Sequence, residues 1–272
     1  MKKYYRYIAV LLAAGVLSCE PEFDTPVDEL GTYSNGEADF SSYVALGNSL
    51  TAGYADGALY ITGQENSYPN IMAQQFALTQ ETNDFTIPYV SDNTGGLLFG
   101  GTVIAENRFV LAVGANGEPG PARYTGSQPT TEVLNTLDGP FRNMGVPGAK
   151  SYHLVAQGYG NAEGVPAGMA NPYFARFATS ASTTVVEDAM MLNPTFFSLW
   201  IGNNDVLGYA TSGGTGEDQT NNTVPSTYGP NDITDPNVFH SVYSGIVETL
   251  TSTATGGVLV NIPDVTSVPY DY

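Results

Sequence analysis

Short apolar runs alternate with segments of helical period along most of this chain. Four β-prone runs have the length of buried strands: 43–46, 141–146, 195–201 and 258–262. Four other segments place apolar residues at helical spacing: 68–76, 149–157, 183–192 and 235–252. Strands that alternate with helices in this way predict an α/β domain with a mostly parallel sheet.

Between about 79 and 139 the periodicity is lost. Gly-Gly pairs at 95–96 and 100–101, and the sequence Gly-Glu-Pro-Gly-Pro at 117–121, indicate turns. An irregular stretch of this length in a compact domain is usually functional or an insertion. We therefore expect a loop-rich insertion that contributes to a substrate pocket or covers it.

Residues 1–18 have the features of a secretory signal. Three basic residues precede an apolar stretch that is too short to span a bilayer. Cys19, the single cysteine, follows Val-Leu-Ser, which resembles a bacterial lipoprotein signal whose cysteine becomes lipidated. The alternative is an ordinary secretory signal with an incidental cysteine. Residues 19–41 are acidic and are interpreted as a tether, which leaves 42–272 for the folded domain.

The chain is strongly acidic. Its 8 Lys and Arg residues and 27 Asp and Glu residues give a net charge of −19. Removal of 1–18 would take away three basic residues and no acidic one, and would leave a net charge of −22. Nucleic-acid phosphates and anionic lipids repel such a surface. We therefore expect no nucleic-acid partner. We expect membrane attachment only through a lipid on Cys19. The protein would then be an outer-membrane lipoprotein of the cell envelope that can face the cell surface.

One cysteine cannot form an intramolecular disulfide, and one cysteine with two histidines is a poor set of metal ligands. The sequence therefore predicts no metal site of this kind.

Three of the predicted strands end in residues that can carry chemistry. Ser49 follows the first strand between small residues, Gly148 follows the second, and Asn204 follows the third. In parallel sheets, binding sites lie beyond the carboxyl ends of the strands. Each residue also has a purely structural interpretation: Ser49 as a helix cap, Gly148 as a turn former, and Asn204 as part of an Asn-Asp turn.

Taken in order, these strand ends resemble the SGNH/GDSL family of serine esterases and lipases. The resemblance spans about 43–265 and rests on Gly-Asn-Ser-Leu-Thr-Ala-Gly at 47–53, Val-Pro-Gly-Ala at 146–149 and Gly-Asn-Asn-Asp at 202–205. Asn-Ile-Pro-Asp-Val-Thr at 261–266 is similar to a segment of a lipoprotein branch of that family, although no catalytic role is assigned to Asp264.

The resemblance implies a flavodoxin-like, doubly wound parallel sheet, the SGNH hydrolase fold. It implies Ser49 as the nucleophile. The oxyanion hole would comprise the backbone N–H groups of Ser49 and Gly148 and the side chain of Asn204. The reaction would be acyl transfer to water, without metal or cofactor. The expected partner is an ester substrate, either an acyl lipid or an O-acetylated glycan.

Two departures from the family pattern stand out. Asn48 occupies the position of the family's Asp, which keeps a short hydrogen-bonding side chain but loses the charge. The Asp-x-x-His motif that supplies the family's base is missing from the sequence. His153 is expected to be a packing or surface residue, and His240 to lie within a flanking helix. We therefore expect that the C-terminal part of the domain is missing, and that the chain is poorly soluble and nearly inactive.

Two classes of function remain open. The first is a lipoprotein esterase or lipase that acts on carboxylic esters. The second is a catalytically inactive surface lipoprotein that binds glycans or lipids on a hydrolase scaffold. A purely structural envelope protein would leave the three coincident strand-end motifs unexplained.

Overall fold

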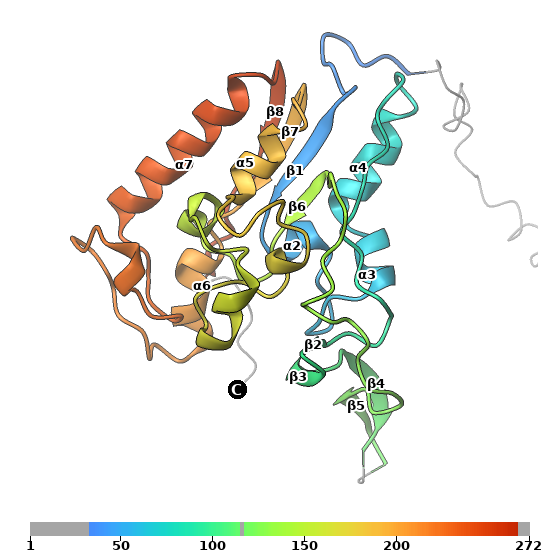
Figure 1. Ribbon diagram of the computed structural model, residues 1–272, viewed down its shortest axis with the longest axis vertical. Coiled ribbons are helices and arrows are strands. Elements are labelled where there is room, and N and C mark those ends of the chain that lie inside the picture. The colour runs from blue at the N-terminus through green and yellow to red at the C-terminus, as the bar shows by residue number, and fades with distance from the viewer. Residues whose placement is uncertain (1–32, 115–116, 266–272) are drawn as a thin grey trace, which may run out of the picture.

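The computed structural model describes residues 33–114 and 117–265, and it has an α/β fold built on a parallel sheet (Figure 1). The sheet comprises β1 (Tyr43–Gly47), β6 (Asn143–Gly145), β7 (Phe196–Trp200) and β8 (Gly256–Leu259). Its four strands lie in the order β6-β1-β7-β8, and every pairing is parallel. The prediction of an α/β domain with a parallel sheet is confirmed.

Helices connect the strands and cover the sheet. The α-helices are α2 (Ser49–Ala52), α3 (Ile61–Glu65), α4 (Tyr68–Phe76), α5 (Val185–Met190), α6 (Asn204–Thr211) and α7 (Pro236–Thr251). Short 3-10 helices occur at η1 (Ser151–Val155), η2 (Ala162–Ala167), η3 (Phe174–Arg176) and η4 (Pro225–Thr227). Figure 1 shows α5 and α7 on one side of the sheet and α4 on the other.

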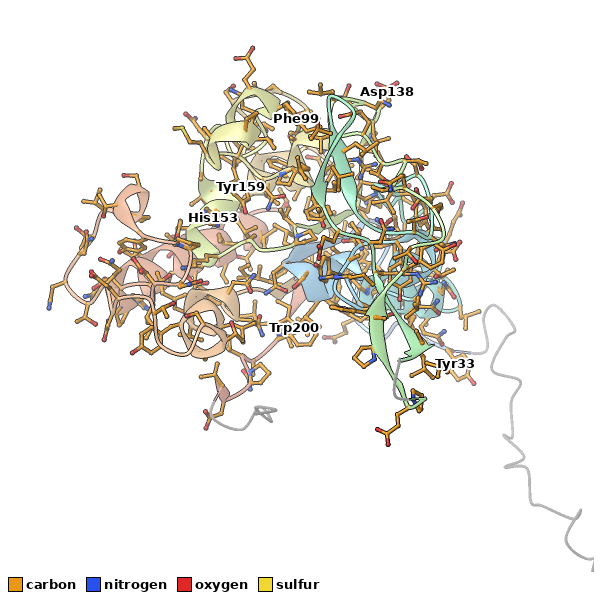
Figure 2. All side chains as sticks on the ribbon, turned by 90° about the horizontal axis from the view of Figure 1, so that it is seen from below. Tyr33, Phe99, Asp138, His153, Tyr159 and Trp200 are labelled. Carbon is orange, nitrogen blue, oxygen red and sulfur yellow. The ribbon has the colours of Figure 1, made fainter. Side chains whose placement is uncertain are left out.

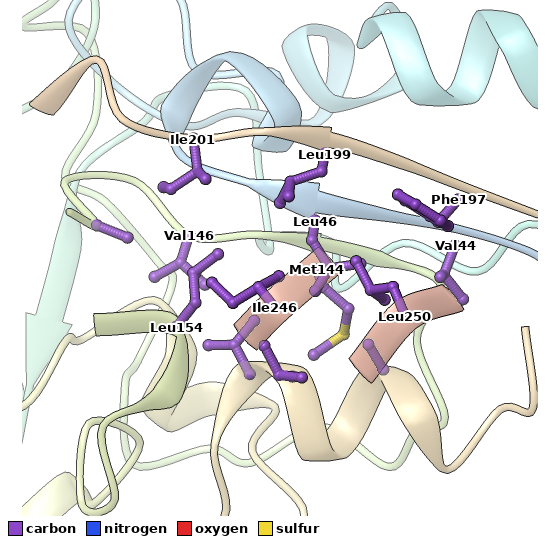
Figure 3. Packing of buried hydrophobic residues seen from close by; sticks show 14 of the residues in the cluster. Val44, Leu46, Met144, Val146, Leu154, Phe197, Leu199, Ile201, Ile246 and Leu250 are labelled. Carbon is purple, nitrogen blue, oxygen red and sulfur yellow. The ribbon is translucent and has the colours of Figure 1, made fainter. Parts of the chain in front are cut away.

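The main core lies between the sheet and α5 and α7. Alternate residues of a strand point to the same face, so Val44 and Leu46 of β1 enter this core together. Ile246 and Leu250 of α7, four residues apart, meet the same face and are almost fully buried (Figure 3). Each such side chain contributes roughly 1.5–3 kcal/mol of burial free energy, which is enough to dock α7 on the sheet.

The opposite face packs against α4 and against the segment that precedes β1. Tyr43 and Ala45 face this side, where they meet Phe76 of α4. The ring of Phe40 stacks on that of Phe76, with a distance of 3.9 Å between the ring centroids. Phe40 therefore belongs to the packed domain, so the expected tether does not extend to 41. Ala38 packs in the same cluster, so several contacts with residues far along the chain hold this segment on the domain.

The segment 79–139 contains more regular structure than its sequence predicts. It forms two antiparallel pairs, β2 (Leu97–Phe99) with β3 (Thr102–Ala105) and β4 (Phe109–Val113) with β5 (Pro119–Arg123). The second pair projects from the body of the protein (Figure 1). Pro and Gly in β5 hide the strand pattern, because the pairing is stabilised by the partner strand and not by local propensity.

Other elements differ from expectation mainly at their ends. The predicted helix at 149–157 is the 3-10 helix η1, and β6 is shorter than the predicted strand at 141–146. The helices α3 and α6 were not predicted. The helices α4 and α7 are confirmed nearly to the residue.

The proposed signal peptide, 1–18, and Cys19 lie outside the described residues. Among the helices of the described ranges, none is both long enough and apolar enough to cross a membrane.

Candidate functional site

The turns after β1, β6 and β7 meet at one edge of the sheet. β1 lies between β6 and β7, so the chain leaves β1 toward one neighbour and later returns to the other side. In open parallel sheets this reversal of strand order is where ligands bind. Figure 2 views the protein from this end, from below the view of Figure 1.

Ser49 is the first residue of α2, and it is not the cap of that helix. The cap is Asn48, whose Oδ1 accepts a hydrogen bond of 3.1 Å from the backbone N–H of Leu50. The structural interpretation of Ser49 as a capping residue is therefore wrong. Asn48 caps α2, so the Ser49 hydroxyl is not used as the cap of this helix.

Asn48 also connects two of the three turns. Its side-chain Nδ2 donates a hydrogen bond of 3.0 Å to Oδ1 of Asn203, which follows β7. Asn48 is almost completely buried, so this bond is shielded from water. The turn that carries Ser49 is thereby held against the turn that carries Asn204.

Ser49 and Asn204 line the same cavity, which has a volume of about 250 Å3. Most of the other lining side chains are apolar: Leu50, Leu207, Ile262, Pro263 and Val265. The cavity therefore combines a hydroxyl and amides with walls that suit an apolar group.

The segment after β8 forms part of this cavity because Gly202 has no side chain. Gly202 has a φ of +114°, which favours glycine, and a Cβ there would overlap the side chain of Ile262. The sequence of the segment 261–266 does not by itself indicate a role in a pocket. The position of this segment depends on the contact between Gly202 and Ile262, which no local sequence pattern predicts.

Gly148 lies next to this cavity but does not line it. Its φ is +81°, its surroundings are open, and it is exposed. The neighbouring carbonyl of Ala149 accepts a hydrogen bond of 2.8 Å from Nδ2 of Asn204. An amide nitrogen has two N–H donors, so this bond occupies one and leaves the other. The structure thus brings Ser49 and Asn204 into one cavity and places the Gly148 turn beside Asn204.

The buried carboxylate of Asp205 connects the turn after β7 to η1 through hydrogen bonds. Asp205 accepts hydrogen bonds from the backbone N–H and the hydroxyl of Ser151, at 2.8 Å and 2.7 Å. Burial raises the pKa of Asp205, and the two bonds from Ser151 oppose that rise. Asp205 therefore does not fix its own turn, as the Asn-Asp pattern suggests. It links α6 to η1, and thus the Asn204 turn to the Gly148 turn.

Neither of the two histidines lines the Ser49 cavity. His153 is stacked on Tyr159, with 4.4 Å between ring centroids, and its Nδ1 accepts a hydrogen bond from the backbone N–H of Lys150. Burial, helped by the charge of Lys150, lowers the pKa of His153 to about 4. His240 is exposed on α7. His153 is thus a packing residue and His240 a residue of a flanking helix, as expected.

The expectation that the segment 79–139 contributes to the pocket is wrong for this cavity. None of its lining residues comes from that segment. The β2–β3 hairpin instead packs in a cluster with Val133 and with Ala175 of η3.

Within residues 33–114 and 117–265, no cluster of His, Cys, Asp or Glu has the arrangement of a metal site. Comparison with known proteins gives no match, since no family model, no curated protein and no solved structure matches this chain.

Proposed function

We propose that this protein is a serine esterase or lipase of the SGNH/GDSL type, with Ser49 as its nucleophile. The observation that carries the proposal is that Ser49 and Asn204 share one cavity at the edge where β1 and β7 end. Two of the motifs behind the family resemblance therefore supply residues to a single site.

The order of the strands supports the same proposal. Counted along the chain, the parallel strands lie in the order 2-1-3-4. A flavodoxin-like sheet has the order 2-1-3-4-5. The described strands agree with the first four of that fold, which is the fold that the family resemblance implies.

The proposed chemistry is the cleavage of a carboxylic ester in two steps. Ser49 Oγ attacks the ester carbonyl carbon, and the carbonyl oxygen becomes an oxyanion. The backbone N–H groups of Ser49 and Gly148 and the free N–H of Asn204 stabilise it, each by about 3–4 kcal/mol. The alcohol then leaves, and water hydrolyses the acyl-enzyme to release the acid.

This mechanism needs a group that takes the proton of Ser49. The residues that line the cavity include no histidine and no carboxylate. A serine without a base is a weak nucleophile. We therefore expect slow turnover by these residues alone, which a base supplied from elsewhere would raise.

The proposed location is the outer membrane, with the protein held by a lipid on Cys19. Metabolic labelling with palmitate tests this part of the proposal. Label is expected on the full chain and is expected to be lost in Cys19→Ala. Label that survives this substitution would contradict the lipid anchor.

The second candidate is a lipoprotein that binds glycans or lipids and has no catalytic activity. It is favoured by the same lack of a base among the lining residues. A fluorophosphonate probe separates the two candidates, because it labels a serine that acts as a nucleophile, and imidazole is included as the base that the cavity lining does not supply.

The enzyme proposal predicts that the probe labels the wild-type chain and not Ser49→Ala. Ser241→Ala is the matched control, since Ser241 is exposed on α7 and does not line the cavity. Equal labelling of the wild type and Ser49→Ala would favour the binding protein.

A further inference from the structure

A second cavity adjoins the one that contains Ser49. Its volume is about 430 Å3, within the range of about 300–1,000 Å3 typical of ligand pockets. Leu50 lines both cavities, so they lie on either side of the residue that follows Ser49. A molecule whose reacting group lies at Ser49 can therefore extend into either.

The two cavities differ in chemistry. The first is walled mainly by aliphatic side chains, whereas the second is lined by Tyr54, Tyr60, Tyr68 and Trp200. Aromatic rings that carry a polar group offer an apolar face together with a hydrogen-bonding edge. In the view from below, Trp200 lies near the middle of the protein, between the segment of α6 and the β4–β5 hairpin (Figure 2).

The aromatic wall is fixed before any ligand binds. The hydroxyl of Tyr68 is within 3.2 Å of the Thr51 hydroxyl and 3.4 Å of the Ser198 hydroxyl. The Tyr68 ring meets Trp200 edge to face at 5.5 Å. A wall held by such contacts loses little conformational freedom on binding, which favours affinity.

Two buried polar atoms of this cavity have no hydrogen-bond partner among the described residues: Ser67 Oγ and Trp200 Nε1. Such groups are uncommon, because an unpaired buried donor costs free energy. Ser67 is 3% exposed and stands at the N-cap of α4, where a serine normally accepts a hydrogen bond from the helix. Its side chain does not do so. A small rotation of the Ser67 side chain would direct its hydroxyl toward a ligand.

We infer that this aromatic cavity binds a neutral sugar ring, the alcohol part of an ester whose acyl group lies in the aliphatic cavity. A sugar has C–H faces that pack on aromatic rings such as that of Trp200, and hydroxyl groups that can pair with the Ser67 hydroxyl once its side chain rotates toward the cavity. An acyl chain would leave the Ser67 hydroxyl unpaired. The net charge of −19 disfavours a uronic acid. The assignment of the sugar as the alcohol part rests on the proposed function.

The test uses Trp200, which is the only tryptophan of the chain, so its fluorescence reports on this cavity alone. The full chain carrying Ser49→Ala, which prevents turnover, is titrated with xylotriose, mannotriose, cellotriose, trigalacturonate and hexanoate. At least one neutral trisaccharide is expected to shift the emission saturably at about 10 mM or below, an ordinary weak affinity. No saturable shift from any neutral trisaccharide, or one from hexanoate alone, would overturn the inference.

Ser67→Ala distinguishes a ligand contact from a structural role. Removal of an unpaired buried hydroxyl is expected to leave the melting temperature unchanged or higher. The same substitution is expected to weaken binding of the trisaccharide about tenfold. Tyr89→Ala is the matched aromatic control, since Tyr89 is exposed and lies outside the cavity. Unchanged binding in Ser67→Ala would overturn the assigned contact.

The inference and the proposed function can fail separately. Fluorophosphonate labelling at Ser49 without any response to a neutral sugar would overturn the inference and retain the enzyme. A response to sugar without labelling would retain the sugar site and favour a binding protein.

Discussion

The side-chain amide of Asn48 donates a hydrogen bond of 3.0 Å to Oδ1 of Asn203, and this bond joins the turn after β1 to the turn after β7. The same Asn48 caps α2 through its Oδ1. One short side chain thus orients the helix that begins at Ser49 and fixes its distance from the turn that carries Asn204.

Asn48→Ala is expected to lower the free energy of unfolding by about 1–2 kcal/mol, because it removes a helix cap and a buried hydrogen bond. It should also slow fluorophosphonate labelling of Ser49. Denaturant unfolding and labelling rates measure the two effects. Asn48→Asp keeps the cap, and Asn203 can turn its amide to donate to the carboxylate, so this variant should remain close to wild type.

Asn161→Ala is the matched control for the cap. Asn161 caps η2 through a hydrogen bond from the backbone N–H of Glu163 and lies outside the Ser49 cavity. Asn161→Ala should lower the free energy of unfolding but should leave the rate of fluorophosphonate labelling of Ser49 unchanged. If both variants slow labelling equally, the Asn48–Asn203 bond does not position the site.

Imidazole is expected to raise the ester hydrolysis that depends on Ser49. The cavity lining supplies no base, and a small base from solution can take the hydroxyl proton. Hydrolysis of p-nitrophenyl acetate is measured against imidazole concentration, and the rate with Ser49→Ala is subtracted. An increase of about a hundredfold is expected, at the low end of the contribution of a general base. Identical imidazole dependence in the two chains would contradict a role for Ser49.

His153 is expected to make the fold sensitive to acid. Its pKa is lowered from 6.5 to about 4 on folding, mainly by burial. Its contribution is therefore fully present above pH 6.5 and is lost as pH falls toward about 4. The loss amounts to about 3 kcal/mol at 1.36 kcal/mol per pH unit. The raised pKa of Asp205 acts in the opposite direction, because protonation of that buried carboxylate favours the folded state.

Urea unfolding of His153→Gln at several pH values measures this effect. The fall in stability between pH 6.5 and 4 should be smaller than in wild type, with His240→Gln as the exposed control. A wild-type slope in His153→Gln would show that another group is responsible.

The outer edge of β8 is expected to limit solubility. Val258 is 40% exposed and Leu259 is 48% exposed, and β8 pairs only with β7 among the described strands. Unpaired apolar edges promote association between chains, and an edge lysine opposes it. Leu259→Lys should therefore raise the soluble fraction after expression. Leu134→Lys, at a residue 49% exposed outside the sheet, tests whether added charge alone has this effect.

The sequence by itself determined the parallel α/β class, because strands β1 and β7 and helices α4 and α7 have strong local patterns. A continuous apolar run of four to seven residues or a four-residue spacing is readable wherever it occurs. It also singled out Ser49 and Asn204, since they lie two and four residues after the ends of such strands.

The tertiary structure decided which of these residues meet and what surrounds them. Ile262 reaches the Ser49 cavity because it packs over Gly202, and Trp200 faces a second cavity beside Tyr68. The local sequence around Ile262 and Trp200 does not indicate a role in a pocket. Their roles arise from contacts between segments far apart in the chain. Local periodicity specifies which face of a helix or strand is buried. It carries no information on which turns, far apart in the chain, pack against one another.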